Sequence, residues 1–381
     1  MPERDTEAAA HFDLASSILV GGKNSPLYKE LVYEKQIATN VSSFYYDREI
    51  AGMFFITADV VAGVDPAIVE QSMDEVMEAF IKKGPSTKLL KAEKTKAIAG
   101  FIRGIQRIGG FGGKSDLLAT CQTYTGNPGC YQESAKYLDA ATSSKIKATF
   151  AEWIDDTPYV LTILPSDQYG LSDESVDRST GVPYPTEKVS FKFPTLQTAT
   201  LSNGAKVVLA QRSDVPLVEM NFQFNFGYAQ ENNDELGFTN FMMDMLNEGT
   251  KKYSSLQFDE ALDSLGSNLG FGSGLDTSVI SLSSLKGNLA DTLDLAKEAL
   301  ISPTFPQAEI DRIKSQTLAS IVQEENRPAS IAYRNIGKLL YGDTHPYGKP
   351  LTGSGLSDTI SSITRTNIID LHARALSPDN L

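Results

Sequence analysis

The sequence is poor in the two residue types that most often hold zinc in proteins. Its 381 residues include 2 cysteines and 3 histidines. A structural zinc site needs four such ligands at close spacing, and neither a further cysteine nor a histidine pair accompanies the two cysteines. The sequence therefore does not support a zinc site built on these cysteines.

The two cysteines, Cys121 and Cys130, enclose the segment QTYTGNPG. A turn at residues 126–129 would bring the two side chains to bonding distance. In an oxidising compartment, a disulfide that closes so short a loop adds about 2–3 kcal/mol. Two separate buried thiols are the alternative, and the sequence leaves both open.

Long apolar runs and a surplus of basic charge are also missing. No segment is apolar over the length needed to span a bilayer, and the formal net charge is −14 with a pI of about 4.8. Because this acidic balance disfavours nucleic acid and anionic membranes as partners, we expect neither. Arg4 is followed by acidic residues and no cleavage segment follows an apolar core, so we expect no signal peptide. Both ends have the character of an inner fragment of a longer protein.

The length favours two domains, because a single core rarely serves this many residues. A polar stretch rich in Pro, Ser and Asp, residues 166–195, is typical of a linker. We therefore expect one domain at residues 1–165 and a second at residues 196–381.

The first domain mixes helical and strand patterns. Helices are predicted at 11–19 and from Leu27 to about Ala38, and strands at 41–46 and 53–61. A further short buried strand is predicted at 159–164.

The second domain begins with strand patterns. Asn203–Gly204 predicts a type I′ hairpin turn. Residues 218–226 alternate between apolar and polar, so one face of this strand should meet helices and the other water or a cavity.

A helix is then predicted within residues 234–250, with Glu235 at its start and Gly249 as its C′ residue. Its buried stripe follows helical spacing and comprises Phe238, Phe241, Met242, Met245 and Leu246. Its opposite face carries Asn240, Asp244, Asn247 and Glu248.

This helix resembles the signature helix of the inverzincin (pitrilysin or insulinase-type, M16) metallopeptidases. Their pattern is Gly-x-x-His-x-x-Glu-His followed by Gly-Thr, in which the two His bind zinc and the Glu acts as general base. The scaffold positions match at Gly237 and Gly249–Thr250, whereas the reacting positions hold Asn240, Met243 and Asp244. Asn lacks the imidazole that zinc prefers and Met has no proton to accept, so the motif is degenerate.

Shorter phrases of the same family recur in the same order along the chain. They are Ile18–Gly22, Ser25–Leu31, Gly52–Phe54, His345–Gly348 and Ser377–Asn380. The resemblance thus covers nearly the whole chain, as the second domain of one M16 half, a linker and the first domain of the other half.

The resemblance implies an α+β fold of two related domains, each a mainly antiparallel sheet packed with helices. It also implies a fragment of a zinc peptidase that degrades or processes peptides, in which this piece is non-catalytic chamber wall. Zinc is then expected in the full-length parent and no cofactor in this chain. The expected partners are the parent's remaining domains or a partner subunit, and a peptide substrate. By analogy with bacterial members, the parent would be periplasmic or otherwise exported.

Two alternatives remain open. The chain could instead serve as a non-catalytic scaffold or assembly subunit of an M16-type complex. In active relatives a Glu late in a long helix is the third zinc ligand, and Glu324 and Glu325 lie in that neighbourhood. Asn240, Asp244 and one of these two Glu residues could together bind a hard cation, although a solvated helix end explains the two Glu residues as well.

Overall fold

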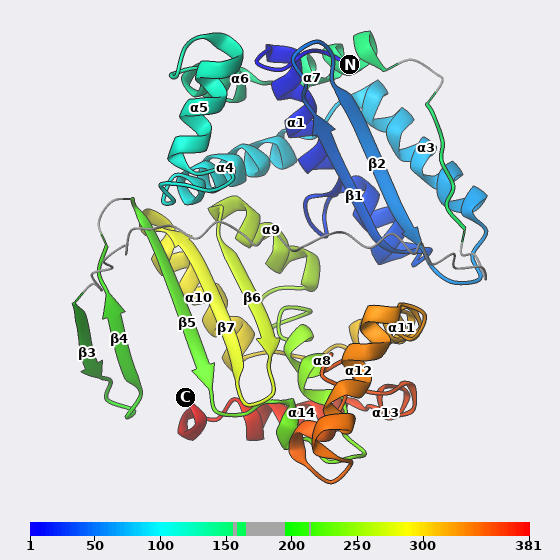
Figure 1. Ribbon diagram of the computed structural model, residues 1–381, viewed down its shortest axis with the longest axis vertical. Helices are drawn as coiled ribbons and strands as arrows, with labels where there is room; N and C mark the ends of the chain where they lie inside the picture. The colour runs from blue at the N-terminus through cyan, green and yellow to red at the C-terminus, as the bar shows by residue number, and fades with distance from the viewer. Residues whose placement is uncertain (155–157, 165–194, 213–214) are drawn as a thin grey trace, which may run out of the picture. The chain divides into compact units, whose positions relative to one another are not determined.

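The computed structural model describes residues 1–154, 158–164, 195–212 and 215–381 (Figure 1). The chain forms two compact units, one of residues 1–154 with 214–381 and one of residues 155–213. The predicted linker at 166–195 lies outside the described residues apart from Thr195. No helix among the described residues is long and apolar enough to cross a membrane.

Residues 1–154 form one two-stranded antiparallel sheet that packs against helices. Strands β1 (Ala38–Tyr46) and β2 (Met53–Val60) form the sheet. The helices are α1 (Glu7–Val20), α2 (Pro26–Tyr28), α3 (Pro66–Lys83), α4 (Thr87–Gly104), α5 (Lys114–Thr125), α6 (Tyr131–Ala140) and α7 (Ser143–Trp153). A six-residue π-helix, η1 (Lys29–Glu34), follows α2.

An aromatic cluster joins this sheet to its helices. Phe12 of α1 is fully buried, and its ring centroid lies 4.6 Å from that of Phe150 of α7 and 5.3 Å from that of Tyr45 of β1. Burial of each such ring stabilises the fold by about 1.5–3 kcal/mol. This cluster explains why the apolar stripe of α1 faces the β1–β2 sheet.

The first predicted helix is confirmed, whereas the second is wrong at its carboxyl end. The helical segment stops at Glu34, and Ala38 is already the first residue of β1. Gln36 adopts a φ of 51°, a left-handed conformation that breaks the helix and redirects the chain into the strand.

Cys121 at the end of α5 and Cys130 before α6 form a disulfide with a Cα–Cα distance of 5.4 Å. Gly126 between them is left-handed, with a φ of 69°, and ends α5. The bridge therefore closes the α5–α6 turn.

Residues 215–381 form a three-stranded antiparallel sheet with the order β5–β7–β6. The strands are β5 (Leu217–Phe224), β6 (Asn268–Ser273) and β7 (Ser278–Leu285). The helices are α8 (Phe238–Asp244), α9 (Ser255–Leu265), α10 (Leu289–Ile301), α11 (Gln307–Glu325), α12 (Pro328–Tyr341), α13 (Ser357–Ser362) and α14 (Arg365–Ala375). The predicted alternation of β5 is confirmed, since Phe224 is buried and Gln223 is exposed.

In the second unit, β3 (Leu196–Thr200) and β4 (Lys206–Ala210) form the predicted hairpin. The predicted type I′ turn is wrong, because that turn needs a positive φ at both central residues. Only Gly204 has one, at 86°, and Leu201 and Ala205 close a three-residue loop. A left-handed glycine in third place is the usual solution for such a loop.

The predicted strand at 159–164 is also wrong. These residues form no strand and are exposed, and no strand among the described residues pairs with them.

We expect reduction of the Cys121–Cys130 disulfide to lower the free energy of unfolding by about 2–3 kcal/mol, since the bridge restricts the unfolded chain. Urea unfolding with and without reductant measures this difference. The Cys121→Ser/Cys130→Ser variant should match the reduced protein and no longer respond to reductant. A response that persists in this variant would show that the bridge is not its source.

Candidate functional site

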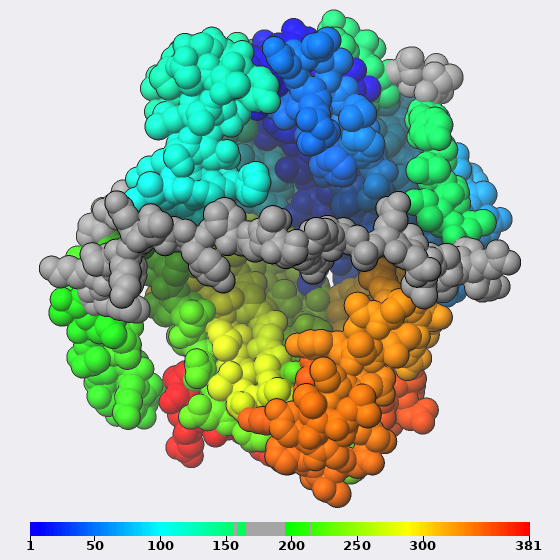
Figure 2. Space-filling view, in the orientation of Figure 1, coloured from blue at the N-terminus to red at the C-terminus, as the bar shows by residue number. Residues whose placement is uncertain are grey.

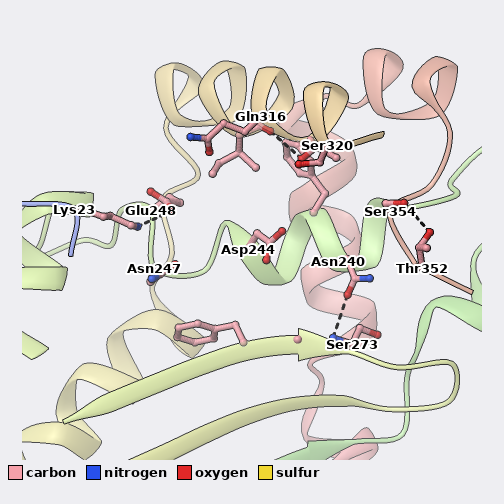
Figure 3. A pocket seen from close by; sticks show the side chains of 16 residues that line it. Lys23, Asn240, Asp244, Asn247, Glu248, Ser273, Gln316, Ser320, Thr352 and Ser354 are labelled. Atoms are coloured by element: carbon pink, nitrogen blue, oxygen red, sulfur yellow. Dashed lines mark hydrogen bonds and ion pairs between the residues drawn. The ribbon is translucent and has the colours of Figure 1, made fainter. Parts of the chain in front are cut away.

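A cavity of about 620 Å³ opens between α8, β6 and α11 (Figure 3). In the space-filling view, the yellow residues of the β6–β7 hairpin are exposed beside the orange residues of α11 and α12 (Figure 2). The cavity is lined from α8 by Asn240 and Asp244, from β6 by Phe271 and Gly272, and from α11 by Gln316, among others. Helix α8, which carries Asn240 and Asp244, therefore forms one wall of this cavity.

A buried carboxylate holds the start of α8. Glu231 accepts hydrogen bonds from the backbone N–H groups of Gly237 (2.9 Å) and Thr239 (2.6 Å). Burial raises the pKa of Glu231, and these two N–H groups oppose the rise. The sequence pattern predicts Glu235 at the start of this helix. In the structure, Glu235 instead forms an ion pair with Arg374, with Nη2 of Arg374 3.2 Å from Oε2 of Glu235. The signal that identifies Glu231 is the unpaired N–H groups of the first turn, which need a nearby acceptor.

Gly237 is required by close packing as well as by conformation. Its φ is 91°, and a Cβ at this position would lie 2.7 Å from the carbonyl oxygen of Ser354. The glycine therefore lets the 352–355 loop approach the first turn of α8.

The helix α8 is shorter than predicted, because it ends at Asp244 and not near Gly249. The chain continues in tight turns, in which Leu246 N–H donates to Met243 O at 3.2 Å and Glu248 N–H to Met245 O at 3.2 Å. These turns deliver Glu248 to the cation partners described below.

Asn240, at the first His position of the motif, is a structural bridge. Its Nδ2 donates to Gly353 O at 3.1 Å, and its Oδ1 accepts from Ser273 N at 3.1 Å (Figure 3). Both polar atoms of the amide are thus committed to the protein. The side chain fixes the end of β6 to the 352–355 loop and is not free to bind a metal.

Met243, at the Glu position, does not line the cavity. Its side chain is fully buried in the core formed with Phe238, Phe241 and Ile321 among others. No general base is available from this position. Together with the engaged amide of Asn240, this removes the donor set that zinc requires, so the residues present do not fit a zinc ion.

Asp244, at the second His position, is the exception, because it points into the cavity and is unpaired (Figure 3). Within the described chain its carboxylate accepts no hydrogen bond and has no ion-pair partner within 4 Å. Asp244 is exposed to solvent, but the cavity walls displace bulk water from one side, and this partial desolvation raises the pKa of Asp244 to about 7. The Glu248 carboxylate adds to the rise, and Lys23 opposes it.

Glu248 is buried, with 4% of its surface exposed, and is paired with two cations. Lys23 Nζ lies 2.6 Å from its Oε1, and Arg312 Nη2 lies 2.6 Å from its Oε2. Ser255 Oγ also donates to Oε2, at 2.6 Å. Burial alone would raise the pKa of Glu248, but Lys23 and Arg312 more than offset it, and the pKa is lowered.

The sequence did not point to Lys23 or Arg312 as part of this site. Arg312 also donates from Nε to Glu309 at 2.7 Å, and its guanidinium lies 4.8 Å from the ring centroid of Tyr33. The available signal was Arg312 itself, which stands beside the apolar residues Ile310 and Ile313 of the long helix. A buried arginine at such a position requires a buried acid as its partner.

Glu324 and Glu325 are not brought to Asp244. The α11 residues that line the cavity are Ile313, Gln316, Thr317 and Ser320, which are all uncharged. Glu324 instead binds Arg334 at 2.6 Å and accepts from Ser354 Oγ at 2.7 Å. Across the ranges that the structure describes, no cluster of three or more His, Cys, Asp or Glu side chains is arranged to hold a metal ion. The hard-cation arrangement is therefore not assembled.

We expect Asp244→Asn to raise the melting temperature at pH 8 by about 2 °C and to leave it nearly unchanged at pH 4. The folded-state pKa of about 7 exceeds the ordinary value of 3.8, so ionisation opposes folding. The stability present at low pH is lost as the pH rises through the range between these two values. Differential scanning fluorimetry measures the shift. Asp370→Asn is the control, because it makes the same charge change at an exposed position of α14. The shift that it causes in the melting temperature should show no such dependence on pH.

We expect Arg312→Met to lower the free energy of unfolding by roughly 3 kcal/mol, because it removes one of the two cations that neutralise buried Glu248. Urea unfolding measures the loss. Lys297→Met, at an exposed position of α10, should change stability by less than about 0.5 kcal/mol. Equal effects of the two substitutions would contradict the role of the buried ion pair.

Two family models match the chain. The model described as insulinase (peptidase family M16) matches residues 206–354, and the model described as peptidase M16 inactive domain matches residues 1–97. The first match contains the cavity helix α8, and the second contains Lys23.

Curated relatives resemble part of the chain. An uncharacterized zinc protease of Rickettsia felis is 25% identical over 181 residues, which cover 48% of this chain and 43% of the relative. The non-peptidase homolog YmxG of Helicobacter pylori is 27% identical over 185 residues, which cover 47% of this chain and 41% of the relative. The chain thus spans less than half the length of these relatives.

Among solved structures, the peptidase M16 inactive domain from Pseudomonas fluorescens aligns with a TM-score of 0.45 and 31% identity, covering 47% of this chain and 43% of that chain. The predicted α+β fold with small antiparallel sheets is confirmed by the strands and helices described above. The chain belongs to the insulinase-type peptidase family M16.

Proposed function

We propose that this chain is a non-catalytic part of an M16-type zinc peptidase and forms wall of the chamber that holds the peptide. One observation carries the proposal. The three reacting positions of the signature helix hold an amide bonded at both ends, a methionine in the core and a lone carboxylate. This set cannot activate a water molecule in the way that a metal and a general base would.

An exposed strand edge supports a role in holding peptide. In the described sheet β6 is an edge strand, since it pairs with β7 alone. Gly270 and Gly272 interrupt its side chains, and a Cβ at Gly272 would meet nothing within 4 Å. An extended peptide can add to such an edge through main-chain hydrogen bonds. Its side chains would then reach the cavity beside Phe271 and Ser273.

The parent protein would supply the chemistry. We propose domains at residues 1–165 and 196–381 joined by a linker at 166–195, and the separate matches at 1–97 and 206–354 support this division. Zinc and the residues that bind it would belong to other domains of the parent or to a partner subunit. The Cys121–Cys130 disulfide supports an exported, periplasmic-type location, where such bonds persist.

A second candidate is a scaffold subunit with no catalytic role in its complex. The similarity to YmxG, named a non-peptidase homolog, favours it. Affinity purification from the native host separates the two candidates. A zinc peptidase domain on the same polypeptide supports the first, and a separate peptidase subunit supports the second.

We expect zinc to leave the melting temperature of this chain unchanged, because no matched site binds it preferentially in the folded state. Scanning fluorimetry across a zinc titration measures this. Internally quenched peptides should not be cleaved with or without zinc. Zinc-dependent turnover that disappears in Asp244→Ala but not in Asp370→Ala would overturn the proposal, and turnover equal in both variants would indicate a contaminating peptidase.

A further inference from the structure

The α8 cavity contains one negative charge that the protein does not neutralise. The Asp244 carboxylate is open to the cavity and has no ion-pair partner within 4 Å in the described part of the chain. The remaining wall of α11, formed by Gln316, Thr317 and Ser320, carries no charge. Asp244 is exposed at this wall, so its carboxylate is free to pair with a cationic group that enters the cavity.

The nearest cations are already committed to another acid. Lys23 Nζ is bonded to Glu248 at 2.6 Å and to Ser255 Oγ at 3.2 Å. Arg312 divides its donors among Glu248, Glu309 and Gln316. Because two cations face Glu248 and Glu309, this group is balanced by itself. It leaves Asp244 as the surplus charge on the cavity wall.

We propose that the α8 cavity binds the guanidinium group of an arginine side chain from an extended peptide added at β6, with Asp244 as its counter-ion. This inference rests on the peptide-holding role proposed above. It adds the side-chain class that the cavity selects.

The cavity offers three features that suit arginine. The Asp244 carboxylate can accept two parallel N–H bonds from the planar guanidinium. Asn247, whose side chain has no hydrogen-bond partner in the described chain, lies on the same wall and can accept a further bond. Phe271 and Ile313 provide apolar surface for the methylene stem and, at the ring, for stacking. A compact ammonium group uses fewer of these contacts.

The position of β6 makes the geometry consistent with a bound strand. Phe271, Gly272 and Ser273 line the same cavity as Asp244, so a peptide paired with β6 would pass its opening. Alternate side chains of a strand point to the same face, and one of them would point into the cavity.

Fluorescence anisotropy of three labelled peptides tests the proposal at pH 8, where Asp244 is ionised. The peptides share one β-prone sequence and differ at a single residue, which is Arg, Lys or Gln. We expect wild-type protein to bind the Arg peptide about tenfold more tightly than the Gln peptide, with the Lys peptide between them. Asp244→Asn should remove the preference and retain the affinity for the Gln peptide.

Two further variants serve as controls. Asp370→Asn, with the same charge change away from the cavity, should keep the full preference for Arg. Asp244→Glu should keep part of it, because it restores the charge. Equal affinity of wild type for all three peptides would overturn the arginine inference while leaving the peptide-holding role intact. Absence of binding by every peptide would instead overturn the peptide-holding role and the inference with it.

Discussion

The buried carboxylate of Glu248 is the constraint on which the site depends. A charge with 4% exposure is tolerated only if cations and hydrogen bonds surround it. Lys23 comes from the amino-terminal part of the chain and Arg312 from α11, so the requirement draws segments far apart in sequence to the end of α8. Because Lys23 and Arg312 both bind Glu248, neither cation is left to pair with another acid of the cavity wall. Asp244, four residues earlier, has no ion-pair partner among the residues that the structure describes.

Helix α8 is held in place by polar contacts and close packing around it. Glu231 still satisfies the first turn, and Gly237 still admits the 352–355 loop. Asn240 uses both amide atoms to join that loop to β6. The position that would carry a general base has become part of the core through Met243. The result is a cavity wall in which the polar contacts of Glu231 and Asn240 hold structure.

Much of the fold was accessible from local patterns. The alternation of β5 and the helix predicted at 11–19 follow from local sequence patterns, and the structure has both. The sequence-based predictions of helices and strands fail where tertiary contacts outweigh the local sequence preference. The edge strand β6, NLGFGS, was not predicted because its glycines weaken the strand pattern. The helix α8 ends before Gly249 because Glu248 must reach Lys23 and Arg312. Residues 159–164 have strand composition, but no strand within the described ranges pairs with them.

The sequence by itself determined that Asn, Met and Asp stand at residues 240, 243 and 244, the reacting positions of the pattern that this segment resembles. It also determined the acidic balance and the mixed α+β character. The helical spacing had already placed Asn240 and Asp244 opposite the buried stripe, but only the tertiary structure decided what each replaced side chain contacts, because those contacts come from segments far apart in the sequence. It placed Met243 in the core, engaged Asn240 and separated Glu324 from Asp244. Pairing of charges over hundreds of residues is a property of the folded chain, and within its described part that pairing leaves the carboxylate of Asp244 without an ion-pair partner at the cavity wall.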